Sequence, residues 1–170
     1  MDKAITTTFM IIASIITTIM VFNAVFPAIA RSRDTLVTMR GRMDERIKSQ
    51  IEIVHASGEL NHNAAWQDTN SDGNFDVFVW VKNIGAVRIP AVEKIDVFFG
   101  PEGNFARIPY QSEAGGAYPN WEWHLENDAY WNPTATLRIT INFSTLLASQ
   151  RYFLKIVLPN GVADTYYFSM

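Results

Sequence analysis

The stretch that decides how this chain folds is AITTTFMIIASIITTIMVFNAVFPAIA, from Ala4 to Ala30, which contains no charged side chain. An apolar run of about 27 residues is long enough to cross a bilayer core about 30 Å thick with some tilt. Water is a poor final environment for such a run, because apolar surface is driven out of water. The sequence therefore predicts a hydrophobic helix that is either a membrane anchor or part of the core of a polymer.

Hydroxylated and small residues interrupt this helix, among them Thr6, Ala13, Ser14 and Thr17. Such residues let helices approach closely and hydrogen-bond across the contact, whereas in a lone helix the hydroxyls bond to carbonyls of their own backbone. We favour helix-to-helix packing. The side chains expected to make these assembly contacts are apolar: Ile12, Ile16, Ile19, Val21, Phe22 and Phe26.

Pro27 removes one backbone hydrogen bond, so a kink is expected near it. Beyond Pro27, apolar residues recur every three or four positions as far as Val54, which is typical of an amphipathic helix. We expect this helix to continue to about Ser57 and to stop at Gly58.

Basic residues dominate the part of the chain that follows the apolar run. Arg31, Arg33, Arg40, Arg42, Arg46 and Lys48 outnumber Asp34, Asp44 and Glu45. Three environments suit this basic segment: solvent, anionic lipid headgroups, or acidic neighbours in an assembly.

The pattern changes from helical to alternating beyond a polar connector, residues 59–74. Short alternating runs predict seven strands: residues 75–81, 93–99, 105–109, 121–125, 135–143, 152–158 and 162–168. Turn sequences such as Asn160-Gly161 separate most of them. The chain is therefore predicted to be α+β, with a long N-terminal hydrophobic helix in residues 1–58 and an antiparallel immunoglobulin-like β-sandwich in residues 75–170.

One segment has the ligand spacing of a calcium loop. Oxygen-bearing side chains alternate along it, and Gly73 permits a sharp turn; they are Asp68, Asn70, Asp72, Asn74 and Asp76. Val79 occupies the twelfth position, where a bidentate Glu is usual, so a calcium site here needs water or an oxygen from elsewhere. Alternatively, these residues simply form the turn into the first strand.

Other candidate sites are weaker. Asn142-Phe143-Ser144 is an N-glycosylation triplet, and strand alternation predicts that Asn142 faces solvent. The tryptophans favour a sandwich core over a carbohydrate platform.

The three histidines lack metal-ligand spacing, and no nucleophile elbow or catalytic carboxylate pair is visible. We expect no catalytic residue, no cofactor other than calcium, and no enzyme activity. A net charge of −3 gives no indication of a nucleic-acid partner.

Several motifs in the β-domain resemble those of the archaellum proteins, which are type IV pilin-like. Val81-Lys82-Asn83-Ile84-Gly85, followed by Ile95-Asp96-Val97-Phe98-Phe99-Gly100, resembles a signature of archaellins and of the related FlaG and FlaF proteins. Trp131-Asn132-Pro133 and Leu158-Pro159-Asn160-Gly161-Val162 occupy the places of that family's later strand and final hairpin. The resemblance covers nearly the whole chain.

This resemblance implies a structural subunit that polymerises with itself, through its N-terminal helix, into an archaellum-like filament at the cell surface, with a precursor in the cytoplasmic membrane. The alternative is a membrane-anchored accessory protein, similar to FlaG or FlaF, whose β-sandwich binds a surface-layer or stator partner. Basic residues after the apolar run favour a cytoplasmic β-domain for a simple anchor, which weighs against an anchor with an outer β-domain. A third hypothesis for the function is a calcium-dependent lectin.

Two features depart from the family pattern. No basic leader precedes Met1, so either the numbering begins after cleavage or the protein is not processed. Ile5 stands where bacterial type IV pilins have Glu, which argues against a bacterial pilin.

Overall fold

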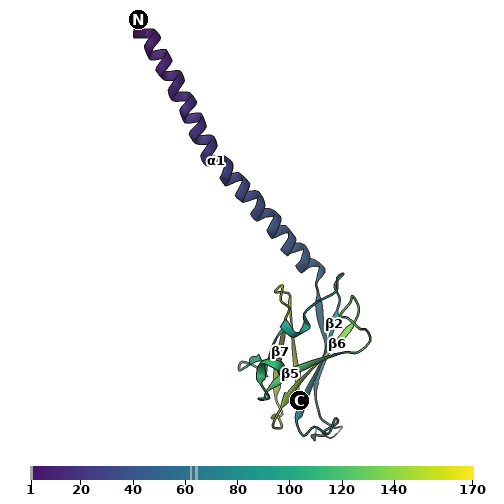
Figure 1. The fold of residues 1–170 in the computed structure, drawn as a ribbon. Helices are drawn as coiled ribbons and strands as arrows, with labels where there is room; N and C mark the ends of the chain where they lie inside the picture. Colours follow the sequence, from purple (N-terminus) through teal and green to yellow (C-terminus); the bar gives the residue numbers. More distant parts are fainter. Residues whose placement is uncertain (1, 62, 64) are drawn as a thin grey trace. The chain divides into compact units, whose positions relative to one another are not determined.

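The computed structural model describes residues 2–61, 63 and 65–170, and the chain in it forms two compact units. The first unit ends at Asp44, and the second, which we call the head, is Glu45–Met170. The first unit lies in α1 (Asp2–Lys48), a helix of 47 residues whose last turn belongs to the head. Figure 1 shows this helix and the strands of the head.

The helix is continuous through Pro27, so the proline does not end it. The bend expected at Pro27 stays a prediction. At 1.5 Å per residue, α1 is about 70 Å long. Among the described residues, α1 is long and apolar enough to cross a membrane, with a mean hydropathy of 2.3 in its most apolar window.

The expectation that the helix continues to Ser57 is wrong. The helix ends at Lys48, and β1 (Ile51–Gly58) follows after two residues. The spacing of Ile47, Ile51 and Val54 fits a helix, but Ile51 and Ile53 also alternate with exposed Glu52 and enter the core. Pairing with a neighbouring strand decides the outcome, because tertiary context overrides a weak local pattern.

The head is a sandwich of two antiparallel four-stranded sheets, as predicted. One sheet has the order β1-β2-β6-β5 and the other has the order β4-β3-β7-β8. The remaining strands are β2 (Phe75–Asn83), β3 (Asp96–Pro101), β4 (Ala106–Ile108), β5 (Asn120–Leu125), β6 (Thr136–Phe143), β7 (Arg151–Val157) and β8 (Ala163–Ser169). Two short helical turns, η1 (Val92–Lys94) and α2 (Gln111–Ala114), lie between them.

The core lies between the two sheets and consists of alternate side chains of each strand. Val77, Val79 and Val81 of β2 are fully buried, as are Leu137, Ile139 and Ile141 of β6 and Leu154 and Ile156 of β7. Each of the seven strands expected from the sequence has a counterpart, and β1 is the additional strand that was not expected. The connector expected at residues 59–74 follows β1; His62 and Ala64 within it lie outside the described residues.

Candidate functional site

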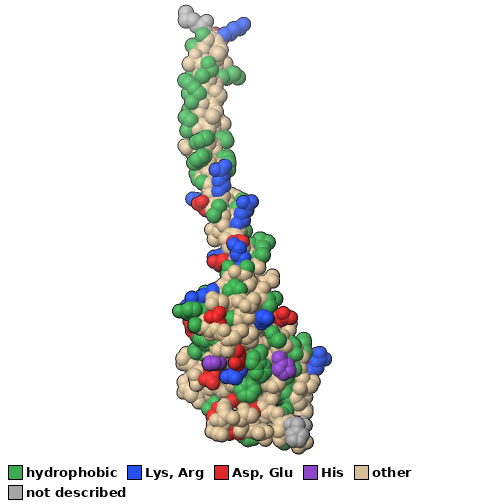
Figure 2. Space-filling model, turned by 90° about the vertical axis from the view of Figure 1, so that its right-hand side faces the viewer, with side chains coloured by type: hydrophobic (Ala, Val, Ile, Leu, Met, Phe, Trp, Pro, Cys, Tyr) green, Lys and Arg blue, Asp and Glu red, His purple; other side chains and the backbone are tan. Residues whose placement is uncertain are grey.

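The surface of α1 is apolar and uncovered within this chain. None of its described residues is buried. The six side chains expected to make assembly contacts are 48–63 % exposed: Ile12, Ile16, Ile19, Val21, Phe22 and Phe26. Figure 2 shows hydrophobic side chains along the N-terminal part of the helix and charged side chains nearer the head. This surface requires lipid or other protein around it.

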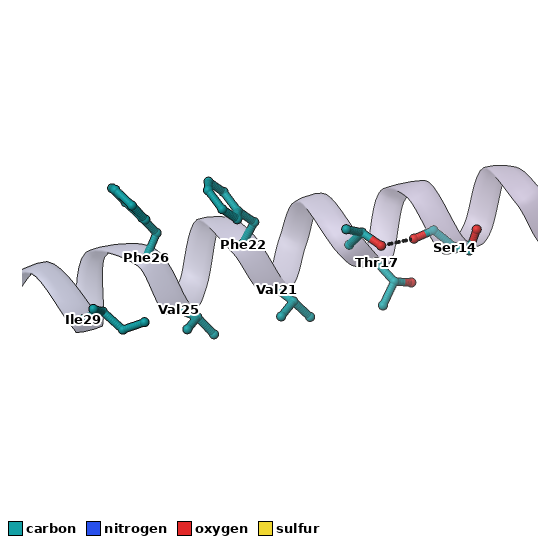
Figure 3. A pocket seen from close by; sticks show the side chains of 8 residues that line it. Ser14, Thr17, Val21, Phe22, Val25, Phe26 and Ile29 are labelled. Carbon is teal, nitrogen blue, oxygen red and sulfur yellow. Dashed lines mark hydrogen bonds between the residues drawn. The ribbon is translucent and has the colours of Figure 1, made fainter.

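A shallow apolar groove follows this helix from Ser14 to Ile29. Phe22 and Phe26 stack with their ring centroids 5.4 Å apart. In Figure 3 these two rings point to one side of the helix, and Val21, Val25 and Ile29 point to the other. Apolar side chains thus project on more than one side of α1.

The hydroxyl groups in this helix bond to their own backbone. Thr6, Thr7, Thr8, Thr17 and Thr18 each donate to the carbonyl four residues earlier, at 2.8–2.9 Å. These bonds satisfy the hydroxyls without a second helix. The threonines are therefore compatible with a lone helix in lipid as well as with packed helices.

A second notable feature lies where α1 gives way to β1. Asn83, at the end of β2, is fully buried, and its amide nitrogen donates to the carbonyls of Val87 at 2.9 Å and Trp131 at 3.0 Å. Its amide oxygen accepts from the backbone N–H of Gly85 at 3.0 Å. One side chain therefore fixes the loop that follows β2.

This loop holds the end of the helix. The N–H groups of Ile84 and Gly85 donate to the carbonyl of Gln50 at 2.9 and 3.0 Å, and that of Ala86 donates to the carbonyl of Lys48 at 2.8 Å. The last carbonyls of a helix have no partner within it, so the loop supplies one. The motif Val81-Lys82-Asn83-Ile84-Gly85 thus connects β2 to the point where the helix becomes a strand.

The β7–β8 hairpin also contacts this junction. Arg46, in the last turn of α1, donates from Nε to the carbonyl of Asn160 at 2.7 Å. Asn160 and Gly161 form the hairpin tip, as predicted, and Gly161 has φ +81°, a conformation that favours glycine. The contact could not be expected from the sequence, because the two residues are more than a hundred positions apart.

The acidic loop is organised by hydrogen bonds of its own. Asp68 accepts from the backbone N–H groups of Ser71 at 2.6 Å and Gly73 at 3.0 Å. Asp72 accepts from the N–H of Asn74 at 2.8 Å, and Asn70 donates to Asp72 and Asp76. This is the turn that the alternative reading predicted.

Two carboxyl groups are buried beneath this loop, Asp76 and Glu59. Glu59 is 2 % exposed and accepts from the backbone N–H and hydroxyl of Thr69 and from the indole of Trp66. Asp76 is fully buried, and among the described residues nothing donates to its Oδ1. Burial, then the nearby charges of Asp72 and Glu59, raise the pKa of Asp76 to about 7. Glu59 is a buried carboxyl that was not expected from the sequence.

The described residues contain no group of three or more His, Cys, Asp or Glu side chains arranged to hold one metal ion. Asp68 and Asp72 point at least one oxygen into turn hydrogen bonds. Calcium binding by Asp68, Asn70, Asp72, Asn74 and Asp76 therefore stays a prediction, and it requires the loop to rearrange.

The expectation that Asn142 faces solvent is wrong. Asn142 is 7 % exposed, and its amide donates to Oδ1 of Asn120 at 3.1 Å. A glycan needs an accessible amide, so this burial does not favour glycosylation, which stays a prediction. Trp121 is fully buried, in agreement with a core role.

Comparisons with known proteins relate this architecture to archaellum proteins. The chain is 28 % identical to the archaellum periplasmic stator protein FlaG from Sulfolobus acidocaldarius, with a TM-score of 0.54. The match covers 71 % of this chain and 99 % of the solved FlaG chain. It also matches the complex of the stator proteins FlaF and FlaG from the same organism, at 27 % identity and a TM-score of 0.52, over 71 % of this chain and 89 % of the matched chain.

Two further matches extend over nearly the whole chain and therefore include α1. An uncharacterized protein of Archaeoglobus fulgidus is 25 % identical over 174 residues, which cover 98 % of each chain. The model of the archaeal-type flagellin family matches residues 4–168. The resemblance read from the sequence is confirmed, and the chain belongs to the archaeal-type flagellin family.

Proposed function

We propose that this protein is a membrane-anchored accessory component of the archaellum, in which α1 spans the cytoplasmic membrane and the head binds a stator or surface-layer partner outside it. The observation that carries the proposal is the match of 71 % of this chain to a periplasmic stator protein, FlaG, over 99 % of the solved FlaG chain. The role is structural and not enzymatic.

Two properties of α1 support its proposed role as a membrane anchor. Its length and hydropathy suit a membrane span. Its threonines satisfy their own hydroxyls, so the helix needs no second copy to complete its hydrogen bonds. Basic residues next to a membrane span favour the cytoplasmic side, so the basic segment after the span disfavours a head outside the membrane. In the proposed topology the head is therefore translocated against this bias.

The second candidate is a filament subunit, as the sequence first suggested. The match of the archaeal-type flagellin family to residues 4–168 favours it, because the match includes the helix as well as the head. In that function α1 packs in the filament core and the head faces outward. Calcium binding by the acidic loop is compatible with both functions.

Membrane retention and topology test the anchor. We expect Ile16→Lys to reduce the membrane-bound fraction of the protein, since a lysine at the centre of a span costs about 3 kcal/mol. Val37→Lys, outside the apolar run at a 70 % exposed position, is the matched control and should leave retention unchanged. Equal retention of both variants would exclude α1 as the anchor.

Cysteine labelling shows on which side of the membrane the head lies. An introduced cysteine is labelled specifically, because the chain has no native cysteine. Asn104→Cys, at an exposed position of the head, should react with a membrane-impermeant maleimide in intact cells. Labelling that appears only after lysis would place the head in the cytoplasm and contradict the proposal.

A further inference from the structure

An apolar seam runs along α1 and continues past the uncharged stretch. Its residues follow at alternating spacings of three and four: Phe22, Val25, Ile29, Ser32, Leu36, Met39 and Met43. This is the a and d pattern of a coiled coil, with Ser32 as its one polar member. Leu36, Met39 and Met43 are 56 %, 62 % and 66 % exposed, so the chain itself leaves the seam uncovered beyond the membrane-spanning run.

Three of the six positions beside this seam are basic, and the other three (Phe26, Ala28 and Thr35) are uncharged. With Leu36 at position a, Arg33 and Arg40 fall at e and Arg42 falls at g. The acidic residues of the same segment, Asp34, Asp44 and Glu45, fall at f, b and c, away from the seam. Charges at e and g determine which helix a coiled coil accepts. The occupant of this seam is therefore expected to carry acidic flanks.

A second copy of the chain does not meet this requirement. In a parallel pair of identical helices, Arg33 and Arg40 at e face Ala28 and Thr35 at g of the other copy, so neither gains an ion pair. The pair instead gathers arginines of both copies around one seam. A lipid surface is also a poorer match, because lipid headgroups do not require an apolar stripe with a heptad spacing.

We propose that the seam of residues 22–43 forms a coiled coil with a helix of a different protein, and that this helix is acidic at the flanking positions that face Arg33, Arg40 and Arg42. The proposal goes beyond the proposed function, since it identifies a partner surface on α1 and not on the head. The apolar seam supplies most of the affinity, and the arginines select the partner.

Binding of two designed peptides to the full chain in detergent micelles tests this proposal. Both peptides carry Ile at a and Leu at d over three heptads, to match residues 22–42; one has Glu at the e and g positions that face Arg33, Arg40 and Arg42, the other has Lys there, and their remaining e and g positions are uncharged. We expect the Glu peptide to bind at least about tenfold more tightly at low salt, with the difference decreasing as salt screens the charges. Equal affinity for both peptides, or no binding of either, would overturn the proposal.

A matched pair of variants separates seam contacts from general charge. Arg33→Glu at e and Arg31→Glu at c make the same charge change two residues apart. Arg33→Glu should weaken binding of the Glu peptide about threefold or more, whereas Arg31→Glu should change it by less than half of that. An equal loss in both variants would show a diffuse basic surface, such as one that faces anionic lipid, and would contradict the proposal.

Disulfide cross-linking tests directly whether the seam pairs with a second copy of the chain. Leu36→Cys on the seam and Gly41→Cys at an f position, both in a chain without native cysteines, are compared under oxidising conditions. Similar, low dimer yields support a different partner. Efficient dimerisation through Leu36→Cys alone would assign the seam to a second copy.

Discussion

A side chain on Gly85 would collide with the backbone carbonyl of Lys48, the last residue of α1. The same added atom would lie 2.6 Å from the backbone nitrogen of Gln50. Gly85 is thus required by close approach of two backbones, and this explains why the motif Val81-Lys82-Asn83-Ile84-Gly85 ends in glycine. The junction between the last turn of α1 and β1, within the head, depends on this contact.

Gly85→Ala should therefore destabilise the head by about 1–3 kcal/mol, because the backbone at Lys48 and Gln50 has to shift. Urea unfolding of the full chain in detergent, followed by tryptophan fluorescence, measures the change. Gly41→Ala is the matched control, since nothing lies within 4 Å of the added atom. We expect this control to be neutral or stabilising by up to about 1 kcal/mol, and a similar loss in both variants would contradict the close-approach argument.

Asn83→Ala should cost more, about 2–4 kcal/mol, because it removes three hydrogen bonds from a fully buried site, those of the amide with Val87, Trp131 and Gly85. The carbonyl of Trp131 keeps the backbone N–H of Ile89 as a donor. Urea unfolding, as for Gly85→Ala, measures this loss of stability. Asn104→Ala, at an exposed position, is the control and should change the free energy of unfolding by less than about 0.5 kcal/mol. An Asn83→Ala head as stable as wild type would show that the buried amide does not hold the loop.

The head should become more stable as the pH is lowered from about 8 to about 5. Folding raises the pKa of Asp76 from 3.8 to about 7, so the folded state binds more protons than the unfolded state between these values. Stability that depends on the protonated form is present at low pH and is lost as the pH rises through 7. Thermal unfolding at several pH values measures the slope.

Asp76→Asn is the variant that isolates this group, since its amide cannot ionise. Its unfolding temperature should vary less over the same pH range. If wild type and Asp76→Asn show the same slope, the pH dependence arises from other groups and the burial of Asp76 has no part in it.

If the acidic loop binds calcium, the ion should stabilise the head by interacting with the carboxyl group of Asp76. The ion favours ionised Asp76, so millimolar calcium should raise the unfolding temperature at pH 8, and Asp72→Ala should abolish the increase. Identical unfolding temperatures in calcium and in chelator would dispose of a calcium site and leave Asp68, Asn70 and Asp72 as turn residues alone.

Much of the head can be predicted from the sequence, because its strands alternate cleanly. Residues 135–143 predict β6 within one residue, since Leu137, Ile139 and Ile141 alternate with polar side chains. Asn160-Gly161 predicts the final hairpin for an equally local reason, the positive φ at Gly161. Local patterns of this kind need no knowledge of distant residues.

The features that escaped prediction depend on contacts between distant residues. β1 reads as a helix because its apolar spacing fits both structures, and only pairing with β2 distinguishes them. The burial of Asn142 results from its cross-strand neighbours Asp76 and Asn120, which alternation along one strand does not reveal. Glu59 was missed for the same reason, since its partners Thr69 and Asp76 gather around it only in the fold.

The measurement that most directly tests the central claim is the location of this chain in cells that make archaella. Filaments are sheared from cells, and the chain is quantified in purified filaments and in stripped membranes by mass spectrometry and immunogold labelling. The account predicts that nearly all of the protein remains in the membranes, with no gold along the filaments. Regular labelling along the filament length, with the protein depleted from the membranes, would contradict it and identify a filament subunit.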